Sequence, residues 1–135
     1  MDENPGEQEA FARGPRPTTT ASADLAAALS AGDLDTATTC FARDGYLLTA
    51  DATAVRGRED IRGVLDQLIS MGAIAEVDQR SILVSGEVAL ASEHWTTRYD
   101  RAPELTYSRT VPTTLVLRRI EGHWKLQIAA PWGWR

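Results

Sequence analysis

The spacing of apolar residues changes once along this chain, at Gly72. Before this glycine, apolar residues recur every three or four positions, as they do on the buried face of a helix. After it that spacing is absent, and four runs of strand character follow, at 75–83, 87–99, 106–119 and 123–130. Hairpin-type connections separate these runs, at Ser85-Gly86, Asp100–Pro103 and Glu121-Gly122. Helices followed by an antiparallel meander predict an α+β domain, with helices packed on one face of a curved sheet.

Three helices are predicted between residues 18 and 72. Residues 18–22 offer several N-caps for the first helix, Gly32 ends it, and Asp33 caps the second. The third helix opens at Arg56-Gly57-Arg58. Its apolar residues have the most regular helical spacing of the chain, at Ile61, Val64, Leu65, Leu68 and Ile69.

The connection between the second and third helices is expected to contain a short strand. Asp44-Gly45 predicts a turn, and the apolar residues of 46–49 predict the strand that follows it. Arg56 and Arg58 flank the start of the third helix. We expect them to pair at the surface with nearby acids such as Asp44 or Glu59.

Charge and composition exclude several classes of partner. The formal net charge of −5 argues against nucleic-acid binding, which depends on neutralising phosphates. No apolar run approaches the roughly 18 residues that span a bilayer. Residues 1–17 are acidic and almost without apolar side chains, so we expect a disordered tail, not a signal peptide, before a domain over 18–135. The single cysteine, Cys40, excludes an internal disulfide and is expected to be a buried, inert thiol of a soluble cytoplasmic protein.

Five segments carry a family resemblance through their order and spacing: Ala31-Gly32-Asp33, 41–45, 55–61, 117–125 and Pro131-Trp132-Gly133. Together they resemble the NTF2-like superfamily, in its SnoaL-like and DUF4440 branch, over about residues 22–133. The resemblance implies a cone-shaped barrel of three N-terminal helices on a strongly curved antiparallel sheet, with an apolar pocket between them. It also implies a homodimer built sheet to sheet. Members range from polyketide cyclases, isomerases, dehydratases and epoxide hydrolases to non-catalytic binding modules, so the fold does not give the reaction.

Ketosteroid isomerase-like members use a carboxylate base, with a tyrosine and a protonated acid as oxyanion hole. Alignment on the shared segments places the base at Thr49, the donor tyrosine at Leu25, its supporting tyrosine at Leu65 and the acid near Val116. Threonine offers no base near neutral pH, so we predict that this constellation is absent. The ending of one subgroup usually reads Ile-Asp-Asn-Pro, whereas 128–131 here read Ile-Ala-Ala-Pro, which removes two further polar groups.

His94 is the best remaining candidate for catalysis, because histidine acts as acid or base near pH 7. If Val88 and Leu90 face the helices, strand alternation turns Ser92, His94 and Thr96 inward as well. A histidine that is merely hydrogen-bonded at the barrel rim is the alternative. The opposite parity is also open, and it would turn inward Trp95, Thr97 and Tyr99.

The candidate ligand-binding residues come from several predicted elements: Thr49, Leu65, Ser92, His94, Thr96, Arg109, Val116 and Trp132. Arg109 could bind an acidic or carbonyl group, or pair across strands with Glu93 or Glu104. His94 and His123 are far apart and no metal-ligand spacing is present, so we predict no metal. No cofactor is predicted.

Two functions of different classes are consistent with these features. The first is a small-molecule pocket protein of bacterial secondary metabolism, a polyketide cyclase-like or accessory enzyme acting on a largely apolar, polyketide-derived ligand. Richness in alanine and arginine, typical of high-GC bacteria, supports it. The second is a non-catalytic ligand-binding or association module, which the missing carboxylates favour. The expected partners are a small apolar or aromatic ligand and a second copy of the chain, with neither nucleic acid nor membrane.

Overall fold

The computed structural model describes residues 19–131 except 50, 52 and 103–107. The predicted tail, 1–17, and the candidate Trp132 lie outside the described residues. The described part contains three helices and six strands: α2 Ala21–Ala31, α3 Leu34–Thr39, β1 Phe41–Leu48, β2 Ala54–Arg56, α4 Arg58–Ser70, β3 Ala73–Ser85, β4 Val88–Tyr99, β5 Arg109–Ile120 and β6 His123–Ala129. Three helices before a strand meander confirm the predicted α+β class.

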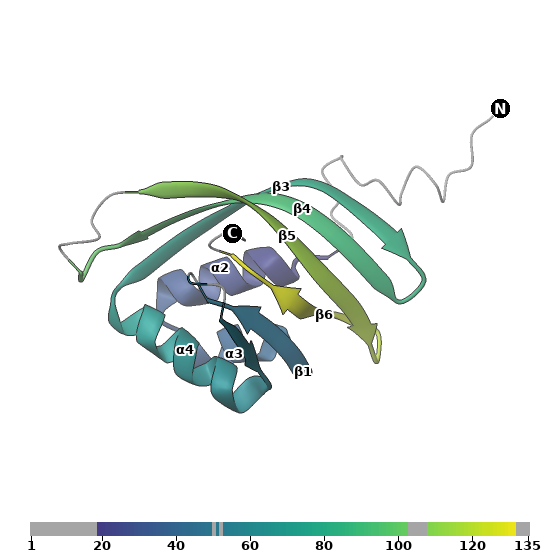
Figure 1. Cartoon of the computed structure of the whole chain (residues 1–135), viewed down its shortest axis with the longest axis horizontal. Coiled ribbons are helices and arrows are strands. Elements are labelled where there is room, and N and C mark those ends of the chain that lie inside the picture. Colours follow the sequence, from purple (N-terminus) through teal and green to yellow (C-terminus); the bar gives the residue numbers. More distant parts are fainter. Residues whose placement is uncertain (1–18, 50, 52, 103–107, 132–135) are drawn as a thin grey trace.

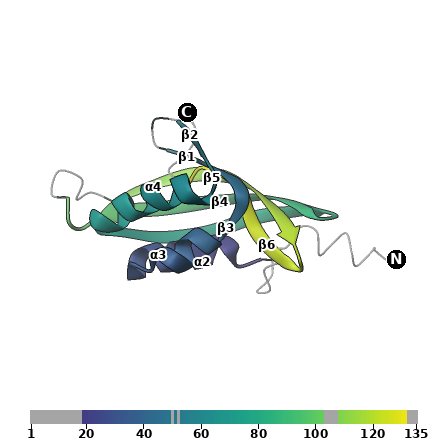
Figure 2. The same ribbon diagram turned by 90° about the horizontal axis from the view of Figure 1, so that it is seen from below.

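The strands form one curved sheet in the order β2-β1-β6-β5-β4-β3. In Figure 1, strands β3, β4 and β5 arch over α2 and α4. Strands β3 to β6 pair as the predicted antiparallel meander. Strand β1 pairs in parallel with β6, so the prediction of a purely antiparallel sheet was wrong at this one junction. The two views in Figures 1 and 2 also show α2 and α3 side by side.

The helix boundaries follow the predicted signals. Gly32 ends α2 in the left-handed conformation, with φ of 72°. The Asp33 side chain caps α3 by accepting a hydrogen bond from the backbone N–H of Thr36 at 3.2 Å. Helix α4 carries acids in its first turn and buries Ile61 and Leu65.

Strand β1 is longer than the sequence predicted, because Asp44-Gly45 lies within it and forms no turn. At this point the pairing of β1 with β6 shifts register, between Phe41 and Tyr46. A Cβ atom on Gly45 would lie 3.0 Å from the carbonyl oxygen of Leu126. Glycine is therefore needed here for a close approach between strands, and the turn prediction was wrong.

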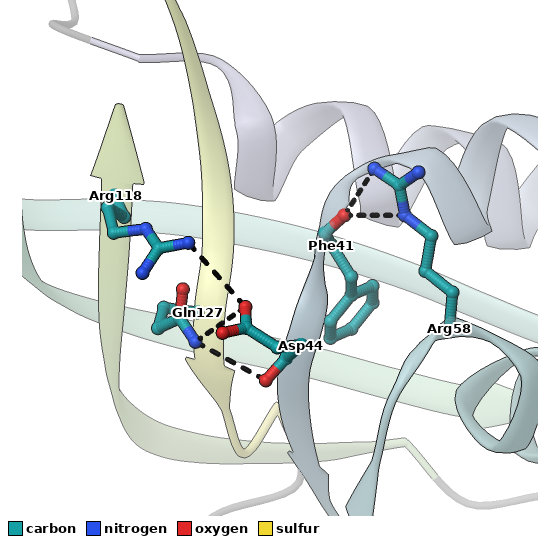
Figure 3. Close-up of polar contacts among 5 residues, drawn as sticks. All are labelled: Phe41, Asp44, Arg58, Arg118 and Gln127. Atoms are coloured by element: carbon teal, nitrogen blue, oxygen red, sulfur yellow. Dashed lines mark hydrogen bonds and ion pairs between the residues drawn. The ribbon is translucent and has the colours of Figure 1, made fainter. Parts of the chain in front are cut away.

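Of the two arginines expected to pair with acids near β1, Arg58 binds a backbone carbonyl instead (Figure 3). Arg58 donates two hydrogen bonds to the carbonyl oxygen of Phe41, from Nε at 2.9 Å and from Nη2 at 2.8 Å. Asp44 instead accepts a hydrogen bond from Gln127 Nε2 and pairs with Arg118 at 3.6 Å. The expected pairing of Arg58 with Asp44 or Glu59 was thus wrong. Arg58 ties the start of α4 to the start of β1.

Large apolar side chains occupy the space between helices and sheet, where the resemblance implied an apolar pocket. The largest fully buried ones come from every layer: Trp95, Phe41, Leu25, Leu47, Ile61, Leu65, Ile82, Leu115, Leu117 and Leu126. These side chains form one buried apolar cluster over the described residues. Among these residues, no helix is both long and apolar enough to cross a membrane.

Candidate functional site

Strand β4 determines which side chains reach the interior. Ala89, Ala91, Glu93 and Trp95 are buried, whereas the residues between them lie on the opposite face. Of the two parities that the sequence left open, the structure has the one with Trp95 inward, so Ser92, His94 and Thr96 lie on the outer face. The apolar pattern misled because Val88 and Leu90, larger than the alanines beside them, are exposed on the outer face.

Glu93 is the buried acid of the inner face, with 1% of its surface exposed. Trp95 Nε1 donates a hydrogen bond to Glu93 Oε1 at 2.8 Å, and Gln79 Nε2 donates one to Oε2 at 3.1 Å. Both donors are neutral, and no ion pair found among the described residues includes Glu93. Burial of a carboxylate is costly unless a positive charge compensates it, so this acid stands out from the remaining core.

A cavity of about 150 Å³ adjoins Glu93 between the start of α2 and strands β3 and β4. Its walls are formed by Thr19, Thr20, Ser22, Ala23, Val77, Gln79 and Glu93. The hydroxyl oxygen of Ser22 is buried and has no hydrogen-bond partner among the described residues. The same holds for Thr113, which lies directly opposite Glu93 on β5. We call Ser22, Gln79, Glu93 and Thr113 the Glu93 site.

The sequence had indicated Glu93 only as a pairing partner for Arg109. In the structure, Arg109 is exposed at the start of β5 and lies opposite Thr97. The signal that could have found Glu93 is Trp95, two positions on. A tryptophan buries more area than a valine or leucine, so it is the better guide to strand parity, and it turns Glu93 inward with it.

His94 and Thr96 lie together in a groove of about 320 Å³ on the outer face, beside Asp78, Arg80 and Thr110. The Nδ1 atom of His94 accepts a hydrogen bond from Arg80 Nε at 2.7 Å, and Arg80 also pairs with Asp78 at 3.2 Å. Thr96 and Thr110 share a hydrogen bond of 2.8 Å. The rim alternative for His94 describes this arrangement better than an interior catalyst.

The remaining sequence candidates do not converge on one site. Thr49 lies at the end of β1, where its hydroxyl donates to Asp51 and, together with Thr53, holds the pKa of that carboxyl below its usual range. Leu65 is a core residue, Ser92 is exposed, and Val116 is half-buried on the outer face. That these residues contact a ligand stays a prediction.

The positions aligned with the isomerase constellation supply no acid or phenol to the interior. Leu25 and Leu65 are fully buried apolar residues. On β5 the inward-facing residues near the aligned acid position are Leu115 and Leu117, whereas Val116 lies on the outer face. Leu115 and Leu117 are both apolar.

Cys40 borders a third cavity, of about 410 Å³, formed by α2, α3 and β6. Burial, followed by the charge of Asp24, raises the pKa of the thiol to about 11. A thiol that is protonated at neutral pH is a poor nucleophile, as expected from the sequence.

The outer face of the sheet carries a row of apolar side chains across four strands. The register places Leu83 opposite Leu90, Leu90 opposite Val116, and Val116 opposite Ile128. Leu83, Leu90 and Ile128 are 44%, 47% and 39% exposed. We call these four residues the outer apolar row.

A model of the SnoaL-like domain matches residues 19–128 of the chain. The chain belongs to the SnoaL-like domain family. The match spans the three described helices and nearly the whole described sheet of this SnoaL-like protein, including the Glu93 site and the outer apolar row. No curated protein matches it in sequence.

Solved structures support the NTF2-like fold of this SnoaL-like protein. A putative calcium/calmodulin-dependent protein kinase II association domain from Xanthomonas campestris has a TM-score of 0.70 and 17% identity, over 90% of this chain and 93% of that one. An NTF2-like protein of unknown function from Shewanella oneidensis has a TM-score of 0.68 and 14% identity, over 82% and 92%. A ketosteroid isomerase-like protein from Erwinia carotovora has a TM-score of 0.65 and 13% identity, over 82% and 88%. At these identities the likeness is one of fold.

Proposed function

We propose that this SnoaL-like protein binds a small molecule in the cavity beside Glu93. The observation that carries the proposal is a buried carboxyl held by two neutral donors, next to a cavity lined by Ser22, whose buried hydroxyl has no partner among the described residues. Buried polar groups in folded proteins normally have partners, so unpartnered groups on a cavity wall favour a ligand that supplies them.

The geometry gives Glu93 a defined chemical role. The indole of Trp95 and the amide of Gln79 each occupy one position on a different carboxyl oxygen. Each oxygen therefore keeps a free acceptor position in a fixed orientation. A carboxyl held in this way serves as a ligand anchor or as a general acid or base for a ligand in the cavity.

The proposed setting is bacterial secondary metabolism, with a cyclase-like or accessory role and a largely apolar, polyketide-derived ligand. The family resemblance and the composition support this setting. The cavity of about 150 Å³ has the volume of roughly five water molecules at about 30 Å³ each. It suits the polar end of such a ligand, whose apolar body would extend along the surface from the cavity mouth.

Binding is tested by the ¹H–¹⁵N resonance of the Trp95 indole, assigned by its loss in a Trp95→Phe variant. We expect some members of a panel of neutral, anionic and cationic fragments to shift this resonance in the wild-type protein. The Glu93→Gln variant should lose the response, while Glu87→Gln, which removes an exposed acid paired with Arg119, should keep it. If no fragment of any charge moves the Trp95 resonance, the proposal is overturned.

The outer apolar row favours a second function, that of an association module. Exposed apolar patches on one face mark interaction sites, and a patch that continues across four strands suits a two-fold contact with a second copy. Similar structures titled kinase association domains, from Xanthomonas campestris and Thiobacillus denitrificans, support this function. We propose a homodimer formed sheet to sheet through the outer apolar row.

The dimer is tested by light scattering at micromolar concentration. The wild-type protein should have twice the chain mass of 14.7 kDa. Leu90→Arg places two charges into the proposed contact and should give the mass of one chain. Gln67→Arg, which adds the same charge on the exposed side of α4, should leave the dimer intact. A wild-type mass near 14.7 kDa would refute the dimer.

A further inference from the structure

We propose that the ligand of the Glu93 site presents a small organic ammonium group to the Glu93 carboxylate. This inference rests on the proposed binding function and names the ligand class of the same site. It concerns the charged end that enters the cavity and leaves the remaining part of the ligand unspecified.

The charge balance of the site is the first argument. Glu93 is 1% exposed, and among the residues that the structure describes, the side chains that line its cavity include no lysine, arginine or histidine. The first turn of α2 lines the same cavity, so the positive end of the helix dipole lies on the side of the carboxyl. That end amounts to only about half an elementary charge, so one negative charge stays incompletely compensated. A cationic group on the ligand supplies the missing positive charge.

The hydrogen-bond inventory is the second argument. An ammonium group has three donors and no acceptor. The site offers three matching acceptors: the second acceptor position on each Glu93 oxygen, and the buried hydroxyl of Ser22, a residue that lines the same cavity and whose hydroxyl has no partner among the described residues. A ligand carboxylate or phosphate would bring a second negative charge beside Glu93. A neutral alcohol could donate only one hydrogen bond and would leave the carboxylate charge unbalanced.

The cavity volume limits the size of the group that enters. With about 150 Å³, the cavity accommodates an ammonium and a few carbon atoms. Primary alkylammonium ions of three carbons are therefore suitable probes. Propanol and propionate have nearly the same shape and differ in charge, so the three compounds separate charge from size.

The experiment measures binding of n-propylammonium, n-propanol and propionate at equal ionic strength, by the Trp95 indole resonance and by thermal unfolding. Only propylammonium should shift the resonance, with millimolar affinity, and it should raise the unfolding temperature as its concentration increases. In Glu93→Gln its dissociation constant should rise at least tenfold. In the control variant Glu87→Gln, which changes an exposed acid, it should stay within twofold of the wild-type value.

Ser22→Ala provides an independent test if Glu93→Gln folds poorly. The Ser22 hydroxyl has no hydrogen-bond partner among the described residues, so its removal breaks no hydrogen bond of the described fold. We expect propylammonium to bind this variant about three- to tenfold more weakly.

Three results overturn the ammonium inference in distinguishable ways. Binding of propanol or propionate in preference to propylammonium would leave a ligand site but assign it another chemical class, such as a carbonyl group held by a protonated Glu93. Equal propylammonium binding by wild type and Glu93→Gln would remove Glu93 as the anchor. If none of the three compounds shifts Trp95 while a larger fragment does, the binding function stands and the ammonium class fails.

Discussion

At the scale of single residues, Cys40 illustrates how burial governs reactivity. Burial raises the pKa of its thiol from 9.0 to about 11, and the charge of Asp24 acts in the same direction. Two pKa units reduce the thiolate fraction at pH 8 about 100-fold. We therefore expect iodoacetamide to alkylate Cys40 at least about 100-fold more slowly in the native protein than in urea, followed by mass spectrometry.

This cysteine is the only one in the chain, so the alkylated mass reports on a single site. The matched control is a short cysteine-containing peptide, whose rate should be the same with and without urea. Native and unfolded rates within threefold of each other would contradict the structural assignment of a buried, protonated thiol.

Two adjacent residues, Glu93 and His94, show why the candidate site was only partly predictable from sequence. Histidine is the more recognisable acid–base residue, but the peptide geometry of a strand sends the two side chains to opposite faces. Which face of β4 points inward depends on the packing of the buried Trp95 in the core. Alternation along the strand does not reveal that face when both faces carry apolar residues. Sequence reasoning could say which residues alternate, but not which set faces inward.

At the scale of elements, glycines separate what local sequence can predict from what it cannot. Gly32 ends a helix through its own backbone conformation, and its role was evident from the sequence. Gly45 lies inside β1 because the Leu126 carbonyl of a strand 81 positions later approaches it closely. The helices and most strands were predictable from periodicity, whereas the start of β1 and its parallel pairing with β6 depend on contacts between distant segments.

A pair of glycine substitutions around α4 tests this distinction. Gly63 is exposed within the helix, and a Cβ atom there would meet nothing within 4 Å, so Gly63→Ala should stabilise the protein by about 0.5–1 kcal/mol. Gly72 follows α4 with φ of +75°, and a Cβ atom there would lie 2.9 Å from the backbone nitrogen of Arg101. Gly72→Ala should therefore destabilise it by more than about 1–2 kcal/mol.

Urea unfolding, followed by circular dichroism, measures both changes under one set of conditions. The two variants make the same chemical change, so side-chain volume and hydrophobicity are matched. Equal effects of the two substitutions on the free energy of unfolding would contradict the left-handed conformation of Gly72 and the close contact between an added Cβ atom and the backbone nitrogen of Arg101.

At the scale of the whole molecule, one sheet separates the two proposed functions. The Glu93 site lies on its inner face with the helices, and the outer apolar row lies on the other face. Strand β4 contributes Glu93 to the first and Leu90 to the second, only three positions apart. The side-chain partners of Glu93 are Gln79 and Trp95, and Leu90 points to the opposite face, so the two side chains share no hydrogen-bond partner among the described residues.

This separation predicts that ligand binding and association are independent. Leu90→Arg should abolish the dimer while changing the propylammonium dissociation constant less than twofold, and Glu93→Gln should abolish binding while leaving the dimer mass unchanged. The Leu90→Arg, Glu93→Gln double variant should combine both losses additively, because neither substitution alters a partner of the other. Light scattering and the Trp95 indole resonance measure the two properties on the same samples. Two results would contradict this independence: dissociation of the dimer on propylammonium binding, or tenfold weaker propylammonium binding by the monomeric variant. Either result would mean that the sheet couples its two faces, because linkage makes the effect of binding on association equal to the effect of association on binding.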